Sequence, residues 1–243
     1  MMTFFITTIA VAFYVNVSVA LLGFIQGNEE VGYYNAAYRI KDVMVSIVTS
    51  LGAVLLPRLS YYIENNMWDK FNNILSKSTQ FIFILSLPLV VFCILFAKPS
   101  VLILAGSAYS GSIIPLQVLA LIIFIVGLSN LTGIQMLIPL KKEKYLCYSV
   151  VIAAVINMVL NLILIPEYGA IGAAVSVMVA ESSILIYQIY ILRAYSQVLF
   201  GGISYMRIIM ALTLAISVSI WLNINLSYNE IVFYLLFRCF VTV

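Results

Sequence analysis

The stretch KKEKYLCYSVVIAAVINMVLNLILIPEYGAIGAAVSVMVAESSILIYQIYILR, residues 141–193, decides the fold of this chain. Between Lys144 and Arg193 its only charged residues are Glu167 and Glu181. A helix of roughly 20 apolar residues crosses the hydrocarbon core of a bilayer. Two such runs are separated here by the turn sequence PEYG around Glu167, in which proline and glycine punctuate the chain. The stretch therefore predicts a transmembrane helical hairpin.

Polar and small residues mark one face of each predicted helix in the hairpin. Asn157 and Asn161 are four residues apart and so lie on the same face. They could line a cavity for a cargo, or they could hydrogen-bond across helices. Gly172, Ser176 and Ala180 repeat every four residues on the second helix. Small residues at this spacing let helices approach closely in lipid.

The composition excludes a soluble globule. Of the 243 residues 64% are hydrophobic and 9% are charged, against about 25% charged in an average soluble domain. There is no histidine, which rules out histidine metal sites and imidazole catalysis, and a net charge of +3 is too small to indicate nucleic-acid binding. The cysteines Cys93, Cys147 and Cys239 lie far apart and are expected to be packing residues. We expect no metal and no cofactor.

The rest of the chain predicts an all-α, polytopic membrane protein. The N-terminus lacks the basic segment of a signal peptide, so it is expected to be a retained helix. Further spans are expected at residues 3–25, 37–56 (stopping at Pro57), 79–97 (bent at Pro88), 113–140 and 208–222, while the apolar run at 231–243 is too short to cross. Residues 98–112 are expected to be partly helical and partly re-entrant. Residues 58–77 have helical amphipathic periodicity, which predicts a helix lying on the membrane surface.

The distribution of positive charge predicts the orientation of these spans. Basic residues are concentrated in cytoplasmic connectors. One set of alternate connectors holds Arg58, Lys70, Lys77, Lys141, Lys142, Lys144, Arg193 and Arg207, and the other holds Arg39, Lys41 and Lys98. We therefore expect the cluster at residues 141–144 to be cytoplasmic, with the connectors around Glu29, Ala105 and Glu167 on the outer side.

Charged residues inside the predicted spans are candidates for function, because they are costly in lipid. Glu181 is such a candidate, although it could also be a buried carboxylate with a structural partner. Arg39 and Lys41 could be interfacial side chains whose heads reach water. Alternatively they could attract an anion at the mouth of a cavity, with Asp42 partly neutralising Lys41. The candidate cavity residues are therefore Arg39, Lys41, Asn157, Asn161 and Glu181.

Sequence motifs of energy-coupling and hydrolytic enzymes are missing. The chain contains no phosphate-binding loop, GxGxxG, GxSxG or HExxH. This argues against an ATP-driven pump and against a membrane hydrolase, and the lack of a large outer loop disfavours a polymerase or ligase. A secondary transporter or a passive membrane scaffold remains.

Six short segments, taken in order, resemble one transporter family. They are EVGYYNAAYR (30–39), LLPRL (55–59), LSLP (85–88), GSAY (106–109), LIPLKKEK (137–144) and NLILIPEYGAIGAA (161–174). Their order and spacing are similar to the C-terminal half of the Wzx/RfbX-type polysaccharide flippases, in the multidrug/oligosaccharidyl-lipid/polysaccharide exporter superfamily. The resemblance covers about residues 4–193.

The resemblance implies a bacterial inner-membrane protein that flips undecaprenyl-pyrophosphate-linked oligosaccharides, for O-antigen or capsule, to the periplasmic leaflet by alternating access. It implies two six-helix bundles around a cationic cavity, with Arg39 as the best candidate to line that cavity. Residues 1–193 would be the C-terminal bundle and residues 194–243 one or two further membrane helices, the last truncated. Partners would be the lipid-linked oligosaccharide, membrane lipids, a separate N-terminal half and polysaccharide assembly proteins, without nucleic acid.

Two departures keep alternative functions open. Family members often carry an aspartate in the first of these spans, where this chain has NVSVALLG (16–23). The family is also about twice as long. A cation-coupled exporter of the same superfamily would need acidic residues in its cavity, and Glu181 is the one available deep in a span. The third alternative is a non-transporting membrane protein or scaffold for polysaccharide assembly.

Overall fold

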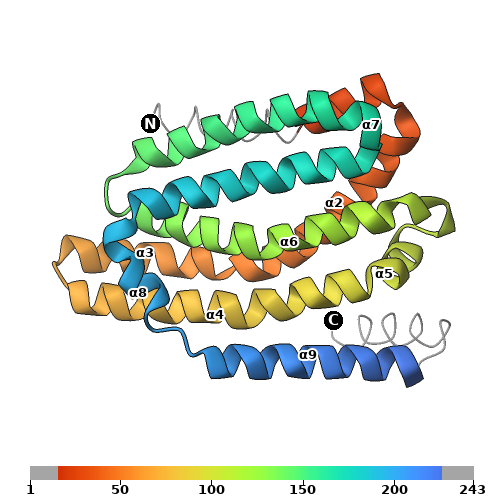
Figure 1. The fold of residues 1–243 in the computed structure, drawn as a ribbon. Helices are drawn as coiled ribbons and strands as arrows, with labels where there is room; N and C mark the ends of the chain where they lie inside the picture. Colours follow the sequence, from red (N-terminus) through yellow and green to blue (C-terminus); the bar gives the residue numbers. More distant parts are fainter. Residues whose placement is uncertain (1–15, 226–243) are drawn as a thin grey trace.

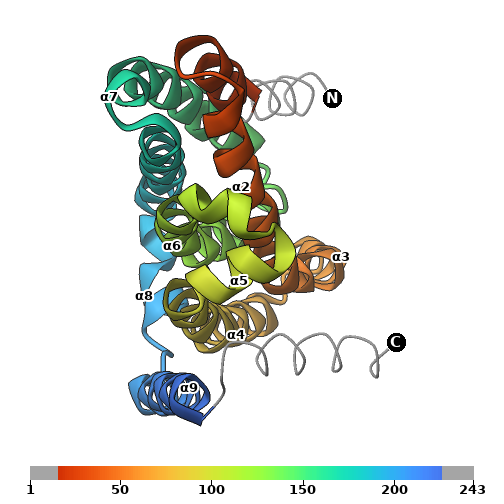
Figure 2. The same cartoon turned by 90° about the vertical axis from the view of Figure 1, so that its right-hand side faces the viewer.

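The computed structural model describes residues 16–225 and is helical throughout that range, with no strand. Four of its helices are long and apolar enough to cross a membrane, or five if the bent pair Arg193–Phe200 and Tyr205–Ser217 is one span. Figure 1 shows the helices lying side by side along one direction. In the end-on view, α2 and α6 lie between α7 on one side and α3 and α4 on the other (Figure 2). The expected all-α, multi-pass membrane architecture is confirmed, whereas the division into a six-helix bundle stays a prediction.

A short helix precedes the second expected span, and two further helices form that span. The helix Asn16–Ile25 is the described part of the span expected at residues 3–25. After it come α2 (Asn28–Thr49) and α3 (Leu51–Glu64), which together make one apolar segment of 37 residues. The expected stop at Pro57 is wrong, because α3 continues through this proline to Glu64. At about 1.5 Å per residue the pair is about 55 Å long, so it extends well beyond a hydrocarbon core of about 30 Å.

Helix α4 (Trp68–Leu95) shows that the expected surface helix at residues 58–77 is wrong. The chain reverses at Asn66, which has a φ of 55°, and so the segment is split between the end of α3 and the start of α4. Its apolar side packs against protein: Leu59 and Phe71 are fully buried in a cluster that includes Leu199 from α8 (Ser196–Phe200). An amphipathic pattern requires an apolar neighbour, and here the neighbour is the rest of the bundle. The span expected at residues 79–97 lies almost wholly within α4, which passes through Pro88 and ends at Leu95.

A short connector and a long helix follow. The connector consists of α5 (Ala97–Leu104) and the 3-10 turn η1 (Ser107–Ser112), which packs against α2. The span expected at residues 113–140 is formed by α6 (Ile113–Asn130) and the π-helical segment η2 (Leu131–Leu137). Thr132 in η2 donates a hydrogen bond to Gln188 Oε1 at 2.6 Å, and Gln188 in turn donates to Ser149 at 3.3 Å. These buried bonds attach η2 to both arms of the hairpin.

The predicted hairpin is confirmed in α7 (Glu143–Ile191), which reverses direction at Gly169 (Figure 1). Gly169 has φ 52° and ψ −129°, a conformation that glycine adopts readily. The predicted face of small residues is buried, and a Cβ on Gly172 would lie 2.4 Å from the carbonyl oxygen of Leu164. The two arms therefore touch backbone to backbone near the turn. The chain continues through η3 (Arg193–Tyr195) and α8 to α9 (Tyr205–Asn225), which covers α4 and includes the span expected at 208–222.

The connectors fall at the two ends of the bundle. The α3–α4 turn, the connector before α7 and the end of α7 lie at one end, while the start of α2, the α5–η1 connector and the turn of α7 lie at the other (Figure 1). This is the alternation that the charge analysis assumed. The side of the membrane that each end faces stays a prediction. The expected apolar run at residues 231–243 and Cys239 lie outside the described residues.

Two side chains clamp the turn of α7 to the start of α2. The Glu30 carboxylate accepts a hydrogen bond from the backbone N–H of Ala170 at 2.7 Å, at the N-terminus of the second arm. Gln26 donates to the carbonyl oxygens of Ile165 and Pro166 at 3.1 and 2.9 Å, at the end of the first arm. An acceptor at a helix N-terminus and a donor at a helix C-terminus satisfy groups that the helix itself leaves unpaired. The clamp thus connects the EVGYYNAAYR and LIPEYGAIGAA segments.

Replacing Glu30 with alanine should lower the thermal unfolding midpoint by a few degrees, because losing a helix-capping acceptor costs about 1 kcal/mol. The matched control is Glu29→Ala, since Glu29 is exposed and, among the described residues, accepts a hydrogen bond from Tyr33 on its own helix alone. Thermal unfolding of both variants in the same detergent would check this. Equal midpoints for the two variants would contradict a stabilising role of the clamp.

Candidate functional site

Helix α2 carries a line of polar side chains along most of its length. They are Asn35, Arg39, Asp42 and Ser46, continued by Ser50 directly after the helix, and all but the half-buried Asn35 are exposed. Spacings of four, three, four and four residues place them on one side of the helix. We call this line the polar face of α2. Polar side chains at membrane depth meet a water-filled cavity or another polar surface rather than lipid, so this face marks the candidate path.

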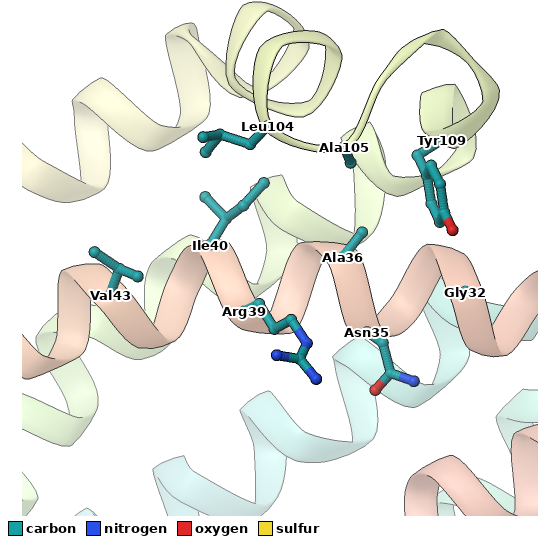
Figure 3. A pocket seen from close by; sticks show the side chains of 9 residues that line it. All are labelled: Gly32, Asn35, Ala36, Arg39, Ile40, Val43, Leu104, Ala105 and Tyr109. Carbon is teal, nitrogen blue, oxygen red and sulfur yellow. The ribbon is translucent and has the colours of Figure 1, made fainter. Parts of the chain in front are cut away.

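Two cavities adjoin the polar face and share Asn35 and Arg39 as lining residues. The larger, of about 600 Å³, lies between α2 and the α5–η1 connector and is lined also by Ile40, Val43 and Leu104 (Figure 3). We call it the apolar cavity. The smaller, of about 320 Å³, lies between α2 and the helix Asn16–Ile25, and its other lining residues are Asn16, Val19, Tyr34, Tyr38 and Asp42. We call it the tyrosine cavity. Both volumes fall within the usual range of small-molecule sites, about 300–1,000 Å³.

Arg39 lies where the two cavities meet. Its side chain is exposed, and within residues 16–225 the structure gives it no hydrogen bond and no ion pair. Figure 3 shows its guanidinium on the same side of α2 as Asn35, pointing away from Leu104. Arg39, which the sequence predicted to line a cavity, therefore has a charge that is open to a ligand at this site.

Lys41 was expected to line a cavity, but it lines neither of the two described here. Its side chain is buried, and Nζ lies 2.6 Å from Asp42 Oδ1 and 3.7 Å from the centre of the Tyr38 ring. The carboxylate and the ring compensate its charge. Lys41 belongs to neither of the two cavities, but Asp42 and Tyr38, which hold it, both line the tyrosine cavity. Sequence reasoning anticipated the pairing with Asp42 and missed the tyrosine.

Asn157 and Asn161 are fully buried between α7 and the helix Asn16–Ile25. Ser18 donates to Asn157 Oδ1 at 3.1 Å, and Asn161 donates to Ser18 Oγ at 2.8 Å and to Asn157 Oδ1 at 2.9 Å. The structure therefore places these two residues in a hydrogen-bond network between helices. Their partner Ser18 belongs to the first-span segment in which family members often have an aspartate. Neither asparagine lines the two cavities.

Glu181 lies behind the tyrosine cavity. It is buried on the second arm of α7 and interacts electrostatically with Tyr34 and Tyr38. Because Glu30 binds Ala170, α2 and the second arm of α7 start at the same height along the bundle. Arg39 comes nine residues after Glu30 and Glu181 eleven after Ala170, which puts both about 15 Å below the clamp. Among the described residues no group of three His, Cys, Asp or Glu side chains is placed to hold a metal ion.

Comparison with known proteins shows which proteins this chain is similar to. Residues 1–114 match the family described as "Polysaccharide biosynthesis protein". A protein named as an O-antigen transporter from Escherichia coli K12 is 27% identical over 177 residues, which cover 73% of this chain and 42% of the relative. A glycan-biosynthesis flippase, Agl15, from Haloferax volcanii is 24% identical over 70% of this chain and 36% of its own length.

Solved structures show the same fold. A MOP superfamily transporter from Pyrococcus furiosus superposes with a TM-score of 0.70 at 18% identity, covering 79% of this chain and 43% of that protein. The lipid II flippase MurJ gives a TM-score of 0.71 at 14% identity, covering 99% of this chain and 53% of MurJ. The chain thus spans about half the length of the proteins it matches, and these relatives are transporters and flippases rather than enzymes. The chain is a multi-pass membrane protein whose sequence is similar to polysaccharide flippases and whose fold is that of these solved transporters.

Proposed function

We propose that this chain forms the C-terminal lobe of a transporter that flips undecaprenyl-pyrophosphate-linked oligosaccharides out of the cytoplasmic leaflet by alternating access. The observation that carries the proposal is Arg39, an exposed cation between two cavities on the polar face of α2 that has no partner within residues 16–225. A guanidinium presents a fork of donors that matches phosphate oxygens. A diphosphate supplies the negative charge that Arg39 lacks within the described residues.

The sign of the available charge favours an anionic cargo over a cationic one. Asp42, the carboxylate that lines the tyrosine cavity, already forms an ion pair with Lys41. Glu181 is buried and has an interaction partner of its own. A cation-coupled exporter would need carboxylates whose charge faces the cavity unpaired. Arg39 instead gives the two cavities a positively charged lining residue.

The polar face of α2 also supports a second lobe. Its exposed members extend from Arg39 to Ser50, a length of about 17 Å that lipid would not solvate. A water-filled path between this lobe and an N-terminal lobe would solvate the whole face. Partners in polysaccharide assembly belong to the same proposal.

Labelling of introduced cysteines tests whether the polar face lines water. In a chain with Cys93, Cys147 and Cys239 replaced by alanine, Ser46→Cys and Ser50→Cys should react with a membrane-impermeant maleimide at least tenfold faster than Val155→Cys. Val155 is 59% exposed on α7 and apolar, so it serves as the lipid-facing control. Equal rates at the three positions would contradict the proposed path.

Complementation tests transport itself. A flippase-deficient strain would receive this chain alone or together with the N-terminal lobe of a relative, and surface polysaccharide would be measured. Restored polysaccharide with the second lobe is the expected result. No restoration in either case, with both proteins present in the membrane, would favour the scaffold alternative.

A further inference from the structure

The two cavities differ in chemistry although they share Arg39. Around α2, steps of about 100° per residue place three rows of side chains in order. Tyr34 and Tyr38 form the first row, Asn35 and Arg39 the middle row with Asp42 at its edge, and Ala36, Ile40 and Val43 the third. Figure 3 shows Ile40 and Val43 pointing to the side of the α5–η1 connector, and Arg39 and Asn35 pointing away from it. The helix therefore separates an aromatic, polar side from an aliphatic side, with the cation between them.

The aliphatic side opens outward. Val43 is 58% exposed and Leu104 is 69% exposed, and both line the apolar cavity. Large apolar side chains exposed at membrane depth are suited to contact with lipid chains, because apolar surface moves favourably out of water. An apolar ligand in this cavity could thus continue into the bilayer between α2 and α5 without crossing a polar layer.

The tyrosine cavity is enclosed by groups of another kind. Asp42 accepts hydrogen bonds, and Asn16 and Asn35 have amides that both donate and accept. The ring of Tyr38 adds an aromatic surface with a polar end. A sugar has many hydroxyl groups that can hydrogen-bond to carboxylates and amides, and its ring can lie against an aromatic side chain. The tyrosine cavity therefore suits a sugar.

We propose that the two cavities divide one amphiphilic cargo between them. The diphosphate binds at Arg39, the first sugar occupies the tyrosine cavity, and the first isoprenoid units occupy the apolar cavity, with the chain leaving between Val43 and Leu104. The order of the three side-chain rows on α2 is the order of the three parts of such a molecule. This inference rests on the proposed function and adds which part of the cargo each cavity holds.

Matched cavity-filling variants test the division. Val19→Phe fills the tyrosine cavity and Ala105→Phe fills the apolar cavity with the same side chain. Binding of two probes to the full chain in lipid nanodiscs would be measured: a polyprenyl diphosphate, and the same lipid carrying one hexose. We expect Val19→Phe to weaken the hexose-bearing probe at least tenfold and the sugar-free probe less than twofold. Ala105→Phe should weaken both at least tenfold.

Equal effects of the two variants on both probes would overturn the division. Should either phenylalanine prevent folding, Val19→Met and Ala105→Met make the same comparison with a more adaptable side chain. Arg39→Gln separates this inference from the proposed function. If it leaves both affinities unchanged, the anion site itself is refuted. If it weakens both probes while the cavity variants do not differ, the division alone is refuted.

Discussion

Replacing Arg39 with glutamine is expected to reduce polysaccharide export at least tenfold in a two-lobed transporter that contains this chain. The guanidinium is exposed, unpaired within the described residues and shared by both cavities, so a phosphate there would bind chiefly through it. A hydrogen bond to a charged group contributes about 1.5–3 kcal/mol, and about 1.4 kcal/mol corresponds to a factor of ten. Arg39→Lys keeps the charge but loses the bidentate geometry. Its export should therefore fall between that of the unmodified protein and that of Arg39→Gln.

Arg58→Gln is the control for this substitution. Arg58 is likewise an exposed arginine on the same continuous helical segment, but it lines neither cavity. Surface polysaccharide would be measured at equal protein level in the membrane. We expect the Arg58 variant to export at the level of the unmodified protein. If Arg39→Gln did the same, Arg39 would have no part in cargo binding.

Replacing Gly172 with alanine is expected to prevent the hairpin of α7 from packing. The added Cβ would lie 2.4 Å from the carbonyl oxygen of Leu164 and 2.6 Å from its carbonyl carbon. Both atoms belong to the backbone and cannot rotate away, so the two arms must separate near the clamp. Overpacking costs about 1–3 kcal/mol and can cost more, which exceeds the gain of about 1 kcal/mol from alanine within a helix.

Gly23→Ala is the matched control. A Cβ on Gly23 would meet Val31 Cγ2 at 3.4 Å, an ordinary van der Waals contact. Yield of monodisperse protein in detergent and its thermal unfolding midpoint would report the outcome. The Gly172 variant should lose most of its folded protein and the Gly23 variant should not. Similar yields would show that the hairpin arms tolerate greater separation.

The hairpin could be predicted from sequence because its signals are local: two uncharged runs and a turn with proline and glycine. The surface helix at residues 58–77 could not be excluded, since its apolar positions look the same whether they face lipid or protein. Phe71 shows the difference, because its ring is fully buried and packs edge-on against Tyr195. That contact joins segments that the sequence does not relate.

In the candidate site, too, local signals could be found from the sequence, whereas contacts between distant segments could not. Arg39 could be found because a charge within a span is uncommon. Asn35, Ser46 and Ser50 were missed, since such residues are frequent in membrane helices; their spacing relative to Arg39 was the available signal. The partners of Asn157 and Asn161 required the helix Asn16–Ile25 to be placed against α7. Glu30 and Ala170 are 140 residues apart, so neither position indicates the other.

The π-helical segment η2 is a place where this lobe can lose one residue. A π-helical turn accommodates more residues per turn than an α-helix, so removing one residue from Leu131–Leu137 would let an ordinary α-helix form. Everything after the deletion would keep nearly its present orientation relative to α6, because the π-helical turn already accommodates the extra residue. The lysines at 141, 142 and 144 and the start of α7 would therefore stay close to their present positions. Homologues that lack one residue in this span should therefore lack it in η2 rather than in α6, where a deletion turns everything after it by about 100°.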